Sequence, residues 1–257
     1  MCETSSPEDA DIIVQKLPSD MGIHRNPRKG TLNAPDKILD DFEFGRSVLV
    51  DEVFPDEFSL EETHNRIEQN TRDLVEYGRP LVSVGGDHSV SYPVLKALKE
   101  NNPEMQLVWL DSHLDVKRPV ESHVSHDVVV RRLVEENVFA PSDVYFVGIT
   151  KIDDDEKDFL SEYDFSIYGP EEMAQFREEY DCSRPGYLSV DIDVLKQSEA
   201  PGTGYPDGQL SLKQAQKVVD EVNPVHADIV EVAPSLDDKG RTVEASRKII
   251  RNIIDSF

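Results

Sequence analysis

The chain has 257 residues, of which 38% are hydrophobic and 31% charged, enough apolar material for the core of one large domain. It contains 27 lysines and arginines and 52 aspartates and glutamates, so the formal net charge is −25. This charge argues against nucleic acid and anionic membranes as partners. Because it has no long apolar run, no signal-peptide pattern and only two cysteines, Cys2 and Cys182, we expect a cytoplasmic protein without a disulfide framework.

Eight short runs, mainly of apolar and β-branched residues, are predicted to be buried β-strands. In chain order these runs are residues 12–16, 47–53, 80–84, 106–110, 143–149, 164–168, 186–190 and 227–230. The polar segments between and after them have helical periodicity. The predicted helices are residues 59–78, 90–101, 127–137, 170–180, 212–222 and 242–256.

Two predicted helices begin with the spacing of a capping box, in which a serine and a residue three positions later cap each other's backbone N–H. These pairs are Ser59 with Glu62 and Ser211 with Gln214, and Thr242 is predicted to cap the last helix. Strands separated by helices favour a parallel sheet covered on both faces. Since no linker or repeat divides the chain, we expect residues 1–257 to form a single three-layer α/β/α domain with a mostly parallel sheet.

Polar clusters follow four of the predicted strands, and ligands bind just beyond the carboxyl ends of the strands in a parallel sheet. The side chains concerned are His88, Asp111, His113, Asp115, Asp191, Asp193 and Glu231. In an extended chain alternate side chains share a face, so Asp111, His113 and Asp115 are expected to project together, as are Asp191 and Asp193.

Two imidazoles and four carboxylates near one point require compensating cations, because carboxylates cannot crowd together while they are ionised. Two divalent metals would supply that charge, and ligands without thiolate favour Mn²⁺, with Mg²⁺, Co²⁺ and Zn²⁺ as lesser candidates. The alternative is that Asp111 and Asp191 only cap following helices and that His88 is a core histidine. The other histidines outside these clusters are interpreted as surface or loop residues, namely His24, His64, His123 and His226.

The segments GGDHS, DSHLD, SVDIDVL, APGTG and EVAP occur in this order along the chain. Together they resemble the ureohydrolase family, which includes arginase, agmatinase and formimidoylglutamase, over nearly the whole chain. The resemblance implies an arginase-like fold, a homo-oligomer (trimer or hexamer) and two Mn²⁺ ions per chain. It implies that one ion is bound by His88, Asp111, Asp115 and Asp191. It implies that the other is bound by Asp111, His113, Asp191 and Asp193, so that Asp111 and Asp191 bridge the pair.

The resemblance also implies roles in catalysis. The two ions would share a hydroxide that attacks the guanidino carbon, and Asp115 would hold this hydroxide in place. Glu231 matches the carboxylate that binds the guanidinium, and His126 matches a histidine that passes protons to the leaving amine. The alternatives are that Glu231 is an ordinary loop carboxylate and that His126 is an ordinary residue at a helix N-terminus.

The segments VGGDHSVSYPVLKAL and VSHDVVVRRLVEE look most like agmatinase, so the leading hypothesis is hydrolysis of agmatine to putrescine and urea. Lys117 departs from the family: if it points inward it favours an amino-acid substrate such as formimidoylglutamate or arginine, and otherwise it is a solvated lysine. A less favoured hypothesis is a catalytically idle metal-binding relative. Another is a two-metal phosphoesterase, but the G-D and G-N-H motifs that follow the D-x-H motif in that class are absent after residue 113.

Other departures from the family's usual motifs lie near the expected pocket. Lys196 and Gln197 stand in place of an Asp-Pro pair, Tyr205 and Asp207 alter a GTGTPE segment, and Asp127 replaces a glycine. Changes close to metal ligands tune both metal and substrate, so these residues bear on the choice of substrate.

Aspartate and glutamate are spread along the whole chain instead of forming one acidic tail. Salt screens the self-repulsion of such a surface, so the composition favours a halophilic organism as the source. An acidic protein from an organism that is not adapted to salt is the alternative.

Overall fold

The structure is a computed structural model that describes residues 3–4, 6–23, 29–121 and 123–257. The interpretations of Cys2 and His24 therefore lie outside the described residues. Eight strands form one sheet in the order β2-β1-β3-β8-β7-β4-β5-β6, and every described strand pair is parallel. The strands are β1 Ile12–Leu17, β2 Val48–Glu52, β3 Leu81–Gly85, β4 Gln106–Leu110, β5 Val144–Val147, β6 Ser166–Tyr168, β7 Gly186–Asp191 and β8 His226–Val230.

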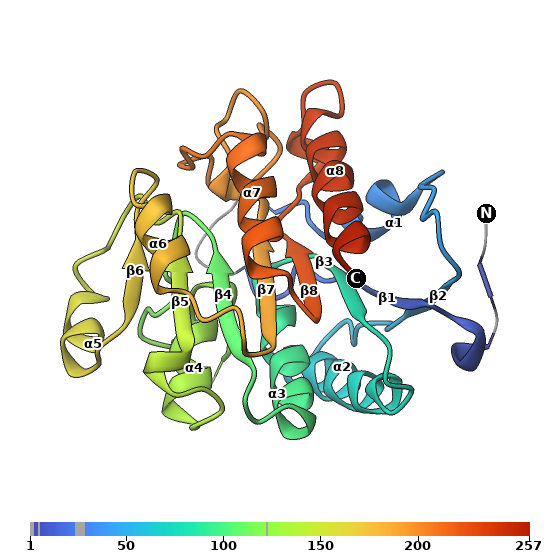
Figure 1. Ribbon diagram of the computed structural model, residues 1–257, viewed down its shortest axis with the longest axis horizontal. Coiled ribbons are helices and arrows are strands. Elements are labelled where there is room, and N and C mark those ends of the chain that lie inside the picture. The colour runs from blue at the N-terminus through green and yellow to red at the C-terminus, as the bar shows by residue number, and fades with distance from the viewer. Residues whose placement is uncertain (1–2, 5, 24–28, 122) are drawn as a thin grey trace.

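Helices cover both faces of the sheet, so the predicted three-layer α/β/α fold is confirmed (Figure 1). One face packs against α1 Ala34–Leu39, α6 Met173–Glu179, α7 Leu212–Val222 and α8 Arg241–Ser256. The other face packs against α2 Leu60–Val75, α3 Ser91–Asn101, α4 Val129–Glu135 and α5 Lys157–Glu162. In the described part of the chain, no helix is both long enough and apolar enough to cross a membrane.

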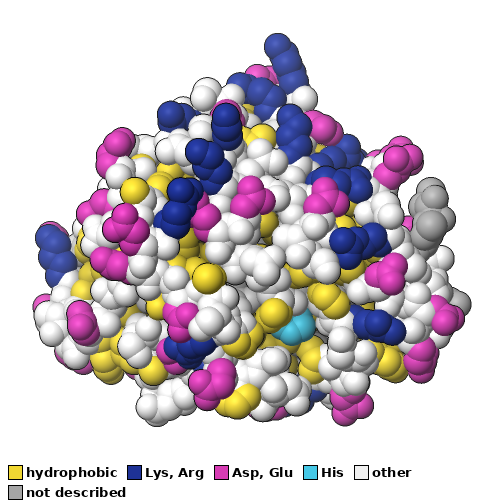
Figure 2. All heavy atoms as spheres, in the orientation of Figure 1, with side chains coloured by type: hydrophobic (Ala, Val, Ile, Leu, Met, Phe, Trp, Pro, Cys, Tyr) yellow, Lys and Arg dark blue, Asp and Glu magenta, His cyan; other side chains and the backbone are white. Residues whose placement is uncertain are grey.

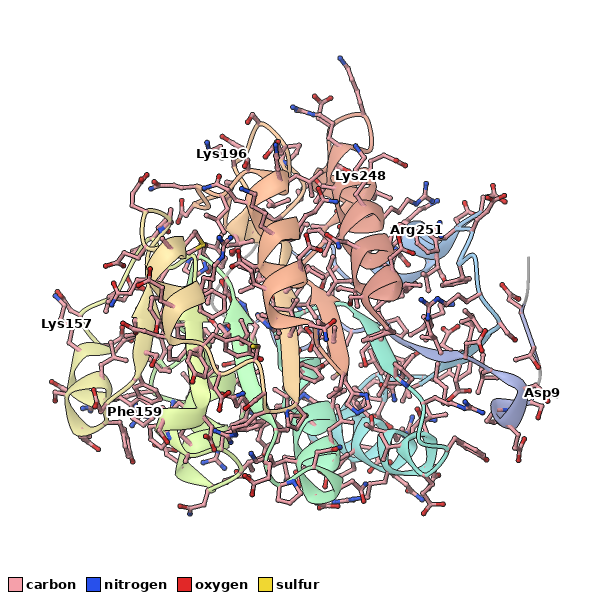
Figure 3. All side chains as sticks on the ribbon, in the orientation of Figure 1. Asp9, Lys157, Phe159, Lys196, Lys248 and Arg251 are labelled. Carbon is pink, nitrogen blue, oxygen red and sulfur yellow. The ribbon has the colours of Figure 1, made fainter. Side chains whose placement is uncertain are left out.

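All eight predicted strands are present, with ends that shift by a few residues. The sheet is entirely parallel over the described strands, and not only mostly so, because each connection crosses a face of the sheet before the next strand begins. Two helices were missed, α1 and α5, which are both only six residues long. On α5 the buried ring of Phe159, labelled in Figure 3, holds the short helix against the core.

The predicted caps are correct in part. Ser211 and Gln214 form a complete capping box at the start of α7. At α2 the Ser59 hydroxyl accepts the N–H of Glu62, but the Glu62 carboxylate pairs with Arg66 along the helix instead of returning to the cap. The prediction for Thr242 is wrong. Gly240 caps α8 in a left-handed conformation, and Thr242 lies inside the first turn.

Two of the four histidines assigned to surface or loop positions are placed differently by the structure. His64 lies on α2 and is buried, because its face of the helix packs toward α3. His226 begins β8, and its Nδ1 accepts the backbone N–H of Leu81 on the neighbouring strand. His123 is exposed, in agreement with the prediction.

Candidate active site

The predicted polar clusters meet because four adjacent strands, β3, β8, β7 and β4, form the centre of the sheet. Leu110 is in register with Val190, and Asp191 with Val230, so these strands end at nearly the same level. The chain order alone does not make β3 and β4 flank the later strands β7 and β8. This arrangement brings the polar residues after all four strands to one edge of the sheet.

His88 lies at the centre of the first group of possible ligands. Its Nδ1 is 3.2 Å from Oδ2 of Asp111 and 3.3 Å from Oδ2 of both Asp115 and Asp191. All four side chains are buried. Asp115 has a φ of +52°, a left-handed conformation that is costly for a residue with a side chain and that aims its carboxylate at this group.

A second group of possible ligands shares Asp111 with the first. Nδ1 of His113 lies 3.0 Å from Oδ2 of Asp193 and 3.5 Å from Oδ1 of Asp111. Ligand atoms of His88, Asp111 and Asp191, and those of Asp111, His113 and Asp193, each lie within 4.8 Å of one another. The predicted six residues therefore come together as two adjoining groups, each of which could hold a metal ion.

The electrostatics of the site show why the carboxylates need a positive partner. Burial and the neighbouring carboxylates raise the pKa of Asp191 well above its ordinary value. Burial and the charge of Asp111 raise the pKa of Asp115 to about 7. Burial raises the pKa of Asp193 to about 6 even though His113 opposes the shift. A bound cation would favour the ionised form of each of these carboxylates.

The donor atoms also fit a metal. Among the described residues, Nδ1 of His88 and Oδ2 of Asp111 are buried and have no hydrogen-bond partner. Buried polar atoms in folded proteins are nearly always hydrogen-bonded, so two such atoms facing one another indicate a missing ligand. Imidazole nitrogen and carboxylate oxygen without thiolate suit Mn²⁺ and similar divalent ions.

The orientation of His88 is set by residues that the sequence analysis missed. Its ring stacks on Trp109, with centroids 3.8 Å apart and planes inclined by 5°. Its Nε2 lies 2.8 Å from Oγ of Ser189, which donates to Asp228 at 2.7 Å. The hydroxyl of Tyr187 donates to the same carboxylate at 2.6 Å. The signal in the sequence was an isolated polar residue inside each of two apolar strands, Ser189 in β7 and Asp228 in β8.

Glu231 and His126 lie together beside the ligand groups. Oε1 of Glu231 accepts the backbone N–H of His88 at 2.9 Å and lies 3.5 Å from Nδ1 of His126. Although burial alone would lower it, the pKa of His126 is raised to about 9 by the contact with Glu231. Nε2 of His126 is buried without a hydrogen-bond partner among the described residues, so it is available to a substrate.

The ring of Tyr205 lies against both histidines that face the pocket. Its centroid is 6.1 Å from that of His126, in a stacked arrangement, and 5.5 Å from that of His113, in an edge-on arrangement. Of the other residues that depart from the family's motifs, Asp127 lines the pocket, whereas Lys196 is exposed and points outward (Figure 3). Tyr205 and Asp127 therefore join Lys117 as departures from the family that line the pocket.

These side chains enclose a small pocket of about 50 Å³. Its lining residues are His113, Asp115, Lys117, His126, Asp127, Lys151, Asp153, Glu156, Asp191, Asp193, Tyr205 and Glu231. Lys117 is thus part of the pocket wall, where its Nζ lies 2.9 Å from Oδ2 of Asp153. It is half-buried, which agrees with the inward alternative considered from the sequence, but its ammonium is already paired with Asp153.

Comparison with known proteins decides the family. The family described as "Arginase family" matches residues 10–255, almost the whole chain. The chain belongs to the arginase family. The agmatinase of Bacillus subtilis (strain 168) is 30% identical to this arginase-family chain. The match covers 97% of this chain and 93% of the agmatinase. The guanidinobutyrase of Pseudomonas aeruginosa is 31% identical over 72% of this chain and 63% of its own length.

Solved structures agree on the fold. The proclavaminate amidino hydrolase from Streptomyces clavuligerus superimposes with a TM-score of 0.85 at 22% identity, over 99% of this chain and 94% of its own. The arginase from Bacillus caldovelox superimposes with a TM-score of 0.83 at 20% identity, over 95% of this chain and 98% of its own. The arginase-like fold is confirmed, and the chain is an enzyme of the ureohydrolase type.

Proposed function

We propose that this arginase-family protein is a binuclear metal hydrolase that cleaves a guanidino C–N bond and releases urea and an amine. The observation that carries the proposal is the pair of ligand groups that share Asp111 and adjoin Glu231 and His126 in one buried pocket. A lone cluster of acids would not require the nearby carboxylate and imidazole that a guanidinium substrate needs.

We assign the metal ligands as the sequence suggests. His88, Asp111, Asp115 and Asp191 would hold one ion. Asp111, His113, Asp191 and Asp193 would hold the other, and Mn²⁺ is the best match to this donor set. When bound, such a pair supplies a water that is activated at neutral pH. The contacts around Nδ1 of His88 and Nδ1 of His113 support this assignment.

The chain's own residues would do the rest of the chemistry. The Glu231 carboxylate accepts N–H groups of the planar guanidinium and fixes its orientation. Nε2 of His126 donates a proton to the amine nitrogen as the C–N bond breaks, since an unprotonated amine is a poor leaving group. Asp115, with its carboxylate in the first ligand group, positions the attacking oxygen.

The identity of the substrate depends on the group that it carries at the end away from the guanidinium. The likeness to the B. subtilis agmatinase, which extends over nearly the whole length of both chains, supports agmatine as the substrate. Lys117 in the pocket wall supports the alternative considered from the sequence, a substrate with a carboxylate. Arginine would release urea, whereas formimidoylglutamate would release formamide in its place. Both alternatives use the same site for the reacting carbon.

The test is product release from the Mn²⁺-loaded protein in concentrated KCl, with agmatine, arginine and formimidoylglutamate offered separately, together with measurement of bound metal. We expect two manganese ions per chain and urea from a guanidino compound, and loss of urea release in Glu231→Gln with the metal retained. Two bound ions without turnover would indicate an idle relative. Hydrolysis of a phosphate ester in place of all three compounds would indicate a two-metal phosphoesterase.

We also propose that the protein works in the cytoplasm of a halophile as a homo-oligomer, a trimer or hexamer. The net charge of −25 supports the halophilic source, and membership of the arginase family supports the homo-oligomer. On the face shown in Figure 2, acidic side chains are scattered among lysines and arginines, so the acid excess is a property of the chain as a whole and not of that face. Light scattering and thermal unfolding across a KCl series test this. We expect assembly and stability to rise with salt, because salt screens the repulsion between acidic surfaces.

A further inference from the structure

Three charged residues form one group in the pocket wall: Lys117, Asp153 and Lys151. Nζ of Lys117 lies 2.9 Å from Oδ2 of Asp153, and Nζ of Lys151 lies 2.8 Å from Oδ1 of the same carboxylate. Lys117 follows β4 and the other two follow β5, so the group joins the carboxyl ends of two neighbouring strands. We refer to these three residues as the lysine clamp.

The lysine clamp is fixed in place by backbone hydrogen bonds. The backbone N–H of Lys117 donates to the carbonyl of Asp127 at 3.0 Å. The backbone N–H of Asp153 donates to Oε2 of Glu156, a buried residue, at 2.9 Å. These two bonds anchor the backbone of Lys117 and Asp153, and the ion pairs with Asp153 keep both lysine Nζ atoms beside the pocket. Positioned charges of this kind are what recognition of one end of a small molecule requires.

The accessible charge of the clamp is positive. It contains two ammonium groups and one carboxylate, and each oxygen of that carboxylate already pairs with one ammonium. The lysine side chains remain 26% and 56% exposed. Two further carboxylates line this side of the pocket, Asp127 and Glu156, and both are buried, the first accepting the Ser125 hydroxyl and the second the N–H of Asp153. The exposed carboxylate of Asp207 lies outside the pocket wall, 4.0 Å from Nε2 of His113.

We propose that Lys117 and Lys151 bind a carboxylate at the far end of the substrate, so that the substrate is a linear guanidino acid. This inference rests on the function proposed above and names its substrate class. An ammonium group at the far end of the substrate, such as that of agmatine, would approach Asp153 only beside two lysine ammonium groups, which repel it. A carboxylate would accept N–H groups from both lysines, and such charge-assisted hydrogen bonds are the strong ones.

Three compounds of matched length test the proposal on the full-length, Mn²⁺-loaded protein: 4-guanidinobutyrate, agmatine and butylguanidine, whose far ends are a carboxylate, an ammonium and a methyl group. We expect kcat/KM to be highest for 4-guanidinobutyrate. A second readout, independent of turnover, is calorimetric binding of the amine products, in which 4-aminobutyrate should bind more tightly than putrescine.

Variants separate charge recognition from folding. Lys117→Met and Lys151→Met should each lower kcat/KM for 4-guanidinobutyrate by roughly tenfold, the usual effect of losing a hydrogen bond to a charged group, while butylguanidine is unaffected. Lys151→Glu should favour agmatine. Lys248→Met is the matched control, because Lys248 is an exposed lysine on α8 (Figure 3).

The outcomes distinguish the two proposals. If agmatine or butylguanidine is cleaved at least as well as 4-guanidinobutyrate, and the lysine variants leave that ratio unchanged, the lysine clamp does not select the substrate and the inference is overturned while the hydrolase function stands. If the metal-loaded protein releases urea from none of the three compounds but does so from arginine, only the inference of a linear guanidino acid without an α-amino group is overturned. If it releases urea from none of the four, the proposed release of urea is overturned and the inference with it.

Discussion

The Nε2 atom of His88 lies 2.8 Å from the hydroxyl oxygen of Ser189. That hydroxyl donates its only proton to Asp228 at 2.7 Å, so Nε2 must carry the hydrogen in the contact with His88. In the neutral ring the lone pair is then on Nδ1, which faces the carboxylates of the first ligand group. A buried chain of three residues thereby presets the tautomer that binds a metal.

Ser189→Ala should therefore weaken metal binding by about 10–100-fold, the usual effect of removing the partner of a metal-binding histidine. Chelator competition on the purified protein measures this affinity directly. The control is Tyr187→Phe, which removes the other hydrogen bond to Asp228 and leaves His88 with its partner. Equal metal affinity in Ser189→Ala and the wild type would mean that packing on Trp109 alone orients the ring.

His126→Gln should lower kcat by roughly 10²–10⁴-fold, because general acid–base groups typically contribute that much, and should leave the metal content unchanged. The glutamine keeps a polar group near Glu231, but its amide is not acidic enough to transfer a proton. Rescue by added imidazole would support proton transfer by His126. A variant with normal kcat would assign the residue a structural role.

Tyr205→Phe and Tyr205→Ala separate the ring from the hydroxyl. The ring contacts both His113 and His126, and aromatic pairs of this kind contribute about 0.5–1.5 kcal/mol. We expect Tyr205→Ala to raise KM several-fold and Tyr205→Phe to keep the wild-type value, in steady-state kinetics with the best substrate. If Tyr205→Phe raises KM as much as Tyr205→Ala does, the hydroxyl itself contacts the substrate.

His64 should make the fold sensitive to acid. Burial, with a smaller contribution from the charge of Lys96, lowers the pKa of His64 to about 3, whereas the unfolded chain has a histidine pKa near the ordinary value of 6.5. Between these values the unfolded state binds a proton that the folded state does not. The contribution of His64 to the free energy of unfolding is therefore fully present above pH 6.5. It falls as the pH is lowered toward 3, by about 1.4 kcal/mol per pH unit.

Urea unfolding at several pH values between 7 and 4 checks this prediction. The wild type should lose more stability than His64→Gln over this range, because glutamine does not titrate. His123→Gln is the control, since His123 is an exposed histidine. The prediction fails if the wild type and His64→Gln lose stability in parallel.

Much of the fold and the core of the site follow from local patterns. Eight short apolar runs separated by helical periodicity are enough to predict a parallel sheet, because strand and helix periods depend on neighbouring residues alone. The alternation of Asp111, His113 and Asp115 correctly predicts that three candidate ligands lie near one another, but the reason differs. The chain is no longer a strand there, and the left-handed φ of +52° at Asp115 turns its carboxylate toward His88. The short helices α1 and α5 were missed because six residues hold too little of a helical period to be recognised.

What the sequence by itself determined is therefore the set of candidate ligand residues and the strand ends that carry them. Only the tertiary structure decided which strands are neighbours, and with them the contacts from Ser189 to His88 and from Lys151 to Lys117 through Asp153. It also decided that His64 is buried. Each of these depends on the order β3-β8-β7-β4-β5, which brings together residues far apart along the chain, and no local periodicity encodes that order.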